Sequence, residues 1–393
     1  MKRVVFAAAT ALMLAVAFRT QPVESHSIAN TTVSFDREVS RIIKKRCISC
    51  HSDQNLGVPL TAYEEVRPWT GSIREEVLRR HMPPWRAVAG YGEFVNDAAL
   101  TSREAQFMLA WIEGNGPKSK EKIIFNFEQM HTPPSERIKG DFDRWPLGKP
   151  DLLKTLDAAT VAPGDGDTVR QADIDLGLRS ERLIRGLEFK PGDRRVVRAV
   201  TFHLRETGQW IGSWTPWYGT VALPDGLGFK VPAGAHITAD IYYRASNEPV
   251  EERGQLGVYW AAKEPEQSPT DLTVSSVPMG AKADESGMAK FEASVRLDTP
   301  SMVLALNPDV PPGLTSFSVS ARLPNGVTTP LLLVRDALPE WPTPYVLKTP
   351  LRFPAGTEIF VAHHFASNSG MPVPERIKLV VSAVTGITPN TTR

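Results

Sequence analysis

The chain has 393 residues, with 45 Lys and Arg against 44 Asp and Glu, so its formal net charge is +1. This balance excludes a protein that binds nucleic acid through a basic excess. Hydrophobic residues at 41% and charged residues at 23% exclude a disordered chain. The length predicts two or three domains, the 33 Pro and 28 Gly favour turn-rich β structure, and two cysteines exclude a disulfide framework.

The first 26 residues have the features of an export signal. Lys2 and Arg3 form a basic start, and an uncharged, mostly apolar run extends from Val4 to Phe18. That run is shorter than the roughly 20 residues that cross a bilayer, and Ala15-Val16-Ala17 offers small residues for cleavage. We therefore expect a signal peptide over 1–26 and a periplasmic protein. The alternative is an uncleaved segment that tethers the protein to the membrane.

Residues 31–117 have a helical pattern. A helix is expected from Ser34 or Asp36 to about Lys45, because apolar residues recur at helical spacing. A second is expected over 72–80. Thr101 and Glu104 have the spacing of a capping box and should open a third helix, which Gly114 and Pro117 end.

The chain changes character after a predicted linker over 118–150, which holds a charge run and Pro133-Pro134. Short β-branched runs then alternate with Gly and Pro turns, which is typical of antiparallel sheets. These features predict two β-sandwiches, over 151–265 and 270–386. The strands expected are 195–204, 235–243, 255–260, 301–306, 316–321, 331–334, 358–361 and 378–384.

Cys47-Ile48-Ser49-Cys50-His51 is a C-x-x-C-H motif. Two thiols in one turn of backbone can reach the two vinyl groups of a single heme, and the adjacent His can then ligate the iron. The motif therefore predicts covalent attachment of one heme c through Cys47 and Cys50, with His51 as an axial ligand. The alternative is a redox-active or metal-binding Cys pair with an incidental His.

The second axial ligand is predicted to be Met82, because Pro83-Pro84 makes the chain stiff directly after it. A His/Met pair suits electron transfer, since it leaves no open position on the iron. The competing ligand is His81. Arg79 and Arg80 could meet heme propionates, or form a solvated helix face. Side chains that could pack on the heme, or serve as ordinary core, are Trp69, Trp85, Phe94, Met108 and Trp111.

The stretch from Cys47 to Pro117 resembles a small class I-like cytochrome c domain. The run His81 to Trp85, with Gly92-Glu93-Phe94 and Trp111-Ile112, resembles bacterial cytochrome domains that precede a copper type II ascorbate-dependent monooxygenase-like region. The resemblance continues through 145–151, 185–186, 191–194 and 353–357. It implies a multidomain α and β fold, in which an N-terminal all-α cytochrome c domain precedes two antiparallel jelly-roll-like β-sandwiches, each with a copper site in that family.

The copper ligands of that family are missing here. Arg198-Ala199 follows Val196-Val197, where the family has a His-His pair, and Tyr242-Tyr243 stands in the region of its His-x-His. The stretch from Asn307 to Val310 aligns with a Met- and His-containing stretch of that family, but it has neither residue. Copper favours imidazole and thioether donors, so copper is not expected. The pair His363-His364 should point to opposite faces of a strand, and His203 and His236 stand singly.

The predicted function is therefore an exported mono-heme c-type cytochrome that transfers electrons in the periplasm. Its monooxygenase-like β region would dock a redox partner protein or act as a scaffold, and no nucleic acid is expected as a partner. One alternative is a divergent metal-dependent monooxygenase-like enzyme that its heme domain supplies with electrons. Another is a β region that acts as a sensor or carbohydrate-binding module.

Overall fold

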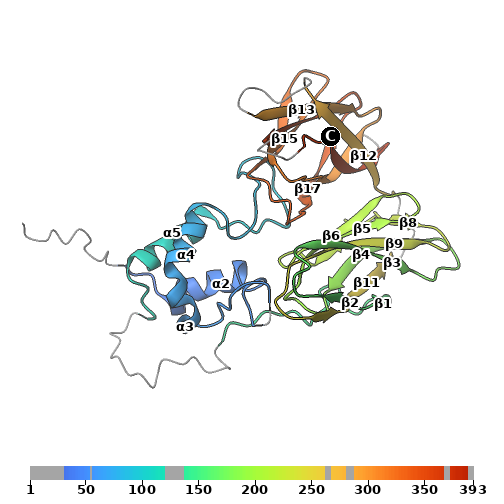
Figure 1. Ribbon diagram of the computed structural model, residues 1–393. Helices are drawn as coiled ribbons and strands as arrows, with labels where there is room; N and C mark the ends of the chain where they lie inside the picture. Colours follow the sequence, from blue (N-terminus) through green and yellow to red (C-terminus); the bar gives the residue numbers. More distant parts are fainter. Residues whose placement is uncertain are drawn as a thin grey trace, which may run out of the picture.

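The computed structural model describes residues 31–53, 55–119, 137–261, 267–279, 287–366 and 372–387. The predicted signal peptide (1–26) and residues 120–136 of the predicted linker lie outside them. Within these ranges, the longest helices are too short or too polar to cross a bilayer. The described chain forms a helical segment and two β regions, which meet around a common centre (Figure 1).

The helical segment consists of short helices joined by irregular chain. They are the π-helical turn η1 (Phe35–Val39), α2 (Ser40–Arg46), α3 (Tyr63–Val66), the 3₁₀ turn η2 (Arg67–Trp69), α4 (Thr70–Leu78) and α5 (Ser102–Glu113). The predicted capping box is confirmed, since Thr101 accepts a hydrogen bond from the Glu104 amide and Glu104 accepts one from Thr101. Apolar residues around Val39, Ile43 and Trp111 form a small core of this segment.

The first β region is a sandwich of two main antiparallel sheets. One has the order β1-β11-β4-β7, with β8 also paired to β4, and the other has the order β3-β9-β5-β6. The strands β2 and β10 form a separate pair. The strands are β1 (Leu152–Thr155), β2 (Ala159–Val161), β3 (Thr168–Asp175), β4 (Arg182–Lys190), β5 (Val197–Leu204), β6 (Trp210–Trp214), β7 (Thr220–Ala222), β8 (Phe229–Val231), β9 (His236–Tyr243), β10 (Val250–Glu252) and β11 (Gln255–Trp260).

The second β region is one eight-stranded antiparallel sheet, in the order β16-β15-β18-β13-β12-β19-β14-β17. The strand β12 joins its two halves, because it pairs with β19 through Thr270–Ser276 and with β13 through Val277 and Pro278. The strands are β12 (Thr270–Pro278), β13 (Met288–Arg296), β14 (Ser301–Pro308), β15 (Leu314–Arg322), β16 (Thr328–Arg335), β17 (Tyr345–Phe353), β18 (Glu358–Ala366) and β19 (Ile377–Thr385).

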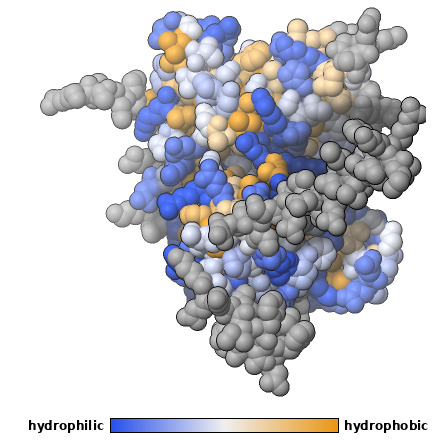
Figure 2. All heavy atoms as spheres, turned by 90° about the vertical axis from the view of Figure 1, so that its left-hand side faces the viewer, coloured by the Kyte–Doolittle hydropathy of each residue, from blue (hydrophilic) through white to orange (hydrophobic). Residues whose placement is uncertain are grey.

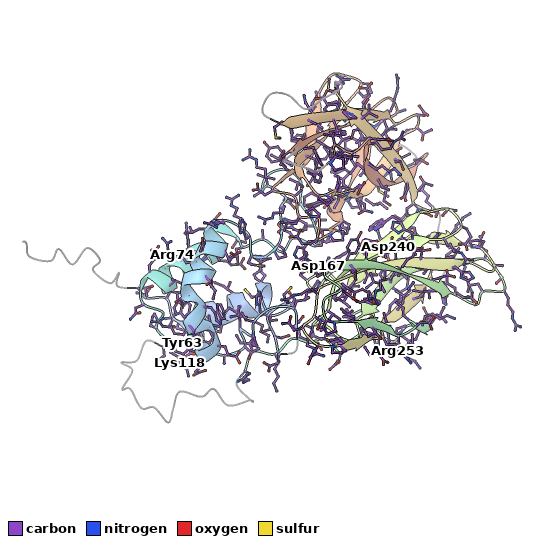
Figure 3. All side chains as sticks on the ribbon, viewed as in Figure 1. Tyr63, Arg74, Lys118, Asp167, Asp240 and Arg253 are labelled. Atoms are coloured by element: carbon purple, nitrogen blue, oxygen red, sulfur yellow. The ribbon has the colours of Figure 1, made fainter. Side chains whose placement is uncertain are left out.

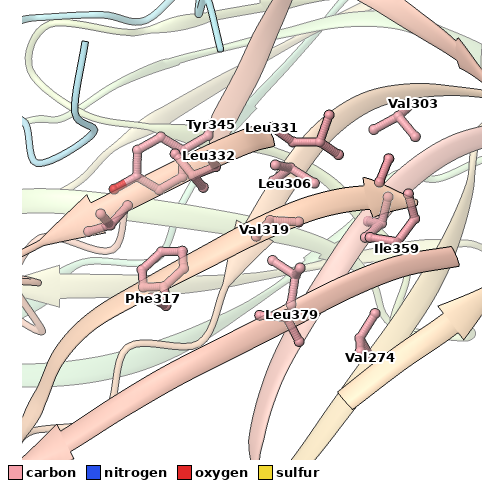
Figure 4. Close-up of a cluster of buried hydrophobic side chains, with 14 of the residues drawn as sticks. Val274, Val303, Leu306, Phe317, Val319, Leu331, Leu332, Tyr345, Ile359 and Leu379 are labelled. Carbon is pink, nitrogen blue, oxygen red and sulfur yellow. The ribbon is translucent and has the colours of Figure 1, made fainter. Parts of the chain in front are cut away.

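The curved sheet encloses its own apolar core. Phe317, Leu331 and Ile359 belong to this cluster, and Figure 4 shows their side chains between the strands. The alternating burial along β15 and β17 is what an antiparallel strand with one covered face should show. The strands that the period-two pattern predicted are confirmed in both β regions, with ends that differ by a few residues.

Residues 85–96 run from the helical segment along the second β region. The amide of Val88 donates to Leu333 O at 2.8 Å, and that of Val95 donates to Val346 O at 2.9 Å. Trp85 and Phe94 pack on Tyr345, with ring centroids 5.1 and 5.5 Å away. Gly92, at φ +91°, passes close to the Leu331 carbonyl, where a Cβ atom would lie 2.4 Å from the oxygen.

The predicted fold class is therefore wrong in its first half. About 12% of the described residues are helical and 43% are in strands, so the described part of the chain is mainly β and its N-terminal segment is not an all-α domain. The reason is local: Pro83, Pro84, Gly90 and Gly92 prevent helix formation after α4, and the extended chain that results packs on the second sheet. The second region is also a single curved sheet, a half-barrel, where a second jelly-roll-like sandwich was expected.

Candidate functional site

The C-x-x-C-H motif forms one compact turn at the end of α2. The amides of Cys50 and His51 both donate to Cys47 O, at 3.0 and 2.9 Å. The loop that follows folds back on the turn, because the Gly57 amide donates to Cys50 O and the Leu60 amide donates to His51 O. These hydrogen bonds hold the two thiols and the imidazole on one turn of backbone.

The ring of His51 is held by its neighbours. Its Nδ1 atom lies 2.9 Å from Val58 O, so Nδ1 carries the proton that this hydrogen bond requires and Nε2 keeps a free lone pair. A Cβ atom on Gly57 would lie 2.4 Å from the ring atoms Cε1 and Nδ1. Burial lowers the pKa of His51, which favours the neutral imidazole. Neutral imidazole with one nitrogen hydrogen-bonded is the form that ligates a metal.

The two cysteines are free thiols. Burial, followed by the charge of the other thiol, raises the pKa of Cys47 to about 12, and burial raises that of Cys50 to about 12. Redox-active Cys pairs have lowered pKa values, because they react as thiolates. The burial of Cys47 and Cys50 shifts their pKa values in the opposite direction.

A cavity of about 410 Å³ opens beside the motif. Cys47, Cys50 and His51 line it together with Met82, so the structure brings all four predicted site residues to one cavity. The rest of its wall in the helical segment is mostly apolar and comes from η2, α2, α4, α5 and the loops between them. It includes Ile42, Ile43, Leu56, Leu60, Trp69, Val77 and Met108.

Met82 and His81 differ in their relation to this cavity. Met82 lines it and has a side chain 41% exposed, whereas His81 lies outside its wall and its Nδ1 is 3.5 Å from the Glu76 carboxylate. The described geometry therefore favours Met82 over His81 as a donor that faces the cavity.

The other predicted packing residues lie in three places. Trp69 and Met108 line the cavity. Trp111 is fully buried in the core of the helical segment, and Trp85 and Phe94 belong to the core of the second β region. Arg79 and Arg80 lie outside the cavity wall; Arg79 pairs with Glu75 on the surface at 2.7 Å. On the face in Figure 2, apolar and polar side chains are interspersed.

Both β regions contribute to the cavity wall, which the sequence reasoning did not foresee. The contributors are Arg198, Trp217 and Arg244 from the first region and Glu340 and Trp341 from the second. Two signals were present in the sequence. The aromatic run 209–218 contains Trp217, and Arg198 stands where the resemblance led us to look for a copper ligand.

The histidines of the β regions stand in separate places. His363 is fully buried, 3.0 Å from Ser276 Oγ, while His364 points to the opposite, exposed face of β18 near Ser316. His236 lies 3.0 Å from the Asp173 carboxylate on the surface, and His203 is 3.9 Å from Asp240. Among the described residues, no three His, Cys, Asp or Glu side chains are placed to hold a metal ion together.

No family model and no curated protein matches this chain. Solved structures that match over part of the chain include the major capsid protein P2 of bacteriophage PM2, at 10% identity and a TM-score of 0.25, over 61% of this chain and 99% of that one. A second is a peptide-N(4)-(N-acetyl-β-D-glucosaminyl) asparagine amidase, at 12% identity and a TM-score of 0.28, over 60% and 97%. A third is a tandem CBM22 domain of Paenibacillus barcinonensis Xyn10C, at 8% identity and a TM-score of 0.15, over 59% and 97%. These scores are too low to support an argument about this chain.

The resemblance to a cytochrome c domain fused to a copper monooxygenase-like region is therefore wrong as a statement of family. The chain is mainly β, its helices are short, and no family or curated relative supports membership. The description as a metal-binding cytochrome is likewise unsupported, because the described residues form no cluster of metal-binding side chains. The predictions of family and fold are thus wrong, whereas the chemistry of the C-x-x-C-H motif stays a prediction.

Proposed function

We propose that the cavity beside Cys47, Cys50 and His51 holds one covalently attached heme c, and that the protein transfers electrons in the periplasm through it. The observation that supports this most strongly is that both thiols, the imidazole and Met82 line one mostly apolar cavity. When bound, such a group supplies one-electron redox chemistry.

The residues present fit this group in three respects. Cys47 and Cys50 are free thiols, which could hold the group through thioether bonds without an oxidant. His51 offers Nε2 while Val58 O holds Nδ1. The cavity size lies within the roughly 300–1,000 Å³ of small-molecule sites.

Each residue then has a distinct role. Cys47 and Cys50 would bond the cofactor, His51 and Met82 would ligate its iron, and the apolar wall would exclude water. Cys47, Cys50 and His51 do not form a group that could hold one metal ion by itself, so the motif suits attachment to a macrocycle better than direct binding of an ion. The signal-like residues 1–26 support export, and the partner would be a redox protein of the periplasm.

The test is the heme and metal content of the full chain, matured in a host with the cytochrome c assembly system. Iron, copper and covalently bound heme are counted per chain after dialysis, for the parent and for Cys47→Ser with Cys50→Ser. We expect about one iron and one covalent heme in the parent, and neither in the double variant.

Two results would overturn the proposal. A parent that matures without covalent heme would refute attachment at Cys47 and Cys50. A parent that binds stoichiometric copper would direct attention to the β regions, and an oxygenase assay with ascorbate would follow. Ser301→Ala, at a position outside the cavity wall, serves as the control for expression and export.

A further inference from the structure

We infer that the two β regions complete the cofactor site: Arg198 binds carboxylate substituents of the bound tetrapyrrole, and Trp217 with Trp341 closes the cavity over it. This inference rests on the proposed function and assigns to the β regions a role beyond docking. It starts from the cavity wall, to which the helical segment and both β regions contribute.

Arg198 is a partly buried cation in the cavity wall. It lies on β5, its side chain is only 17% exposed, and its Nη1 is 2.8 Å from the Asp167 carboxylate. Asp167 itself is half exposed, at the end of the first region that faces the helical segment (Figure 3). A guanidinium has five N–H donors in a planar fork, so one contact with Asp167 leaves donors for a second carboxylate.

The two tryptophans join the β regions at this point. The ring centroids of Trp217, from the first region, and Trp341, from the second, are 5.4 Å apart at 47°. The guanidinium of Arg198 lies 5.8 Å from the Trp341 ring. Cation, Trp341 and Trp217 therefore form one stack across the boundary of the two β regions, and all three side chains line the cavity.

A further arginine ties the first β region to the heme-binding loop. Arg244 donates a hydrogen bond from Nη1 to Leu56 O, directly before Gly57, the glycine that packs on His51. A shift of the first region would therefore move the loop that orients the imidazole. This contact links the position of the β region to the position of an axial ligand.

The first β region supplies two of the three arginines in the cavity wall. The wall contains Arg46, Arg198 and Arg244 against Glu76 and Glu340. Arg46 is paired with Glu104 at 3.0 Å, and Glu76 lies beside His81. Arg198 pairs with Asp167 at 2.8 Å, and Arg198 and Arg244 are the two cations that the first β region turns to the cavity. The remaining donors of these guanidinium groups suit the carboxylates of a tetrapyrrole. The mostly apolar remainder suits its ring.

The test compares full-length variants matured with heme. Arg198→Gln and Trp341→Leu change the inferred contacts. Arg205→Gln is the matched control for the first, because Arg205 directly follows β5, lies 2.8 Å from Asp173 and is absent from the cavity wall. Trp260→Leu is the control for the second, since Trp260 also lies beside an arginine, Arg182, at 6.0 Å.

Two properties are measured for each variant: the reduction potential, and the shift in thermal midpoint of the β structure between the heme-loaded chain and the same chain with Cys47→Ser and Cys50→Ser. We expect all variants to keep one covalent heme. Arg198→Gln should lower the potential, because a nearby cation disfavours the more positive oxidised state. Arg198→Gln and Trp341→Leu should both reduce the heme-dependent thermal shift, whereas the controls keep it.

The outcomes separate the two proposals. If the parent carries no covalent heme, the proposed function and this inference both fail. If the parent carries heme, and Arg198→Gln and Trp341→Leu match their controls in potential and thermal shift, the inference fails while the proposed function stands.

Discussion

The Nδ1 atom of His51 lies 2.9 Å from the carbonyl oxygen of Val58, and this contact turns the other ring nitrogen away from the loop. This contact requires glycine at position 57, because the Cβ atom of any other residue there would collide with the His51 ring. The loop 55–58 thus orients the imidazole, and the motif alone does not.

Gly57→Ala should displace the His51 ring. The new methyl carbon would lie 2.4 Å from two ring atoms, and overpacking of this kind costs about 1–3 kcal/mol. We expect a lower thermal midpoint for the helical segment and, in heme-loaded protein, an altered absorption spectrum. Gly71→Ala in α4 is the control, because nothing lies within 4 Å of its Cβ position. Equal spectra and midpoints for both variants would contradict this role of Gly57.

Met82→Leu should remove the thioether donor from the cavity while keeping its volume. In heme-loaded protein we expect a lower reduction potential and the binding of carbon monoxide to the reduced form, since a vacant position replaces the Met ligand. The measurement is a redox titration with parallel carbon monoxide spectra. Met108→Leu, another methionine of the same wall, should behave as the parent. If Met82→Leu also matched the parent, the assignment of Met82 would be wrong.

Asp271 should make the contact between the β regions sensitive to pH. It accepts a hydrogen bond from the Trp210 amide at 2.7 Å, and burial raises its pKa from 3.8 to about 6. The folded state therefore favours the protonated acid. Its stabilising contribution is complete below about pH 4 and is lost as the pH rises through 6.

Asp271→Asn keeps an acceptor for Trp210 and removes the titration. We expect the thermal midpoint of Asp271→Asn to rise relative to the parent as the pH increases from 4 to 7. Asp298→Asn, an exposed aspartate of the second β region, should follow the parent across this range. A constant difference between Asp271→Asn and the parent at all pH values would contradict the shifted titration.

His363 should have the opposite pH dependence. Burial, together with the neighbouring charge of His364, lowers the pKa of His363 from 6.5 to about 4. The folded state favours the neutral ring, so the stability that it contributes is present above pH 6.5 and is lost as the pH falls toward 4.

His363→Leu should therefore flatten the fall in thermal midpoint between pH 6.5 and 4. Ser276 keeps a partner in this variant, because its Oγ also donates to Ile377 O at 2.9 Å. His364→Leu, on the exposed face of the same strand, should retain most of the parental slope. Parallel slopes for the parent and His363→Leu would show that the buried ring does not control acid stability.

Local signals in the sequence predicted the elements of this chain well. The capping residues Thr101 and Glu104 predicted the start of α5, and period-two runs predicted β5, β9 and β11 almost to the residue. A capping box depends on hydrogen bonds within a few residues, and strands favour particular residue types, so a linear pattern records both. The C-x-x-C-H turn belongs to the same class, and its chemistry stays a prediction.

Long-range packing determined the contacts that the sequence pattern did not predict. Residues 85–96 have no strand period, yet they pair with β16 and β17 because those strands offer free edges. The same holds for the cavity: Met82 joins Cys47, Cys50 and His51 there through the loops of the helical segment, and Arg198 and Trp341 join them from the two β regions, more than 100 residues away in the sequence. The residue pattern of a segment does not predict such contacts, because they form only when separate elements bury their apolar faces against one another.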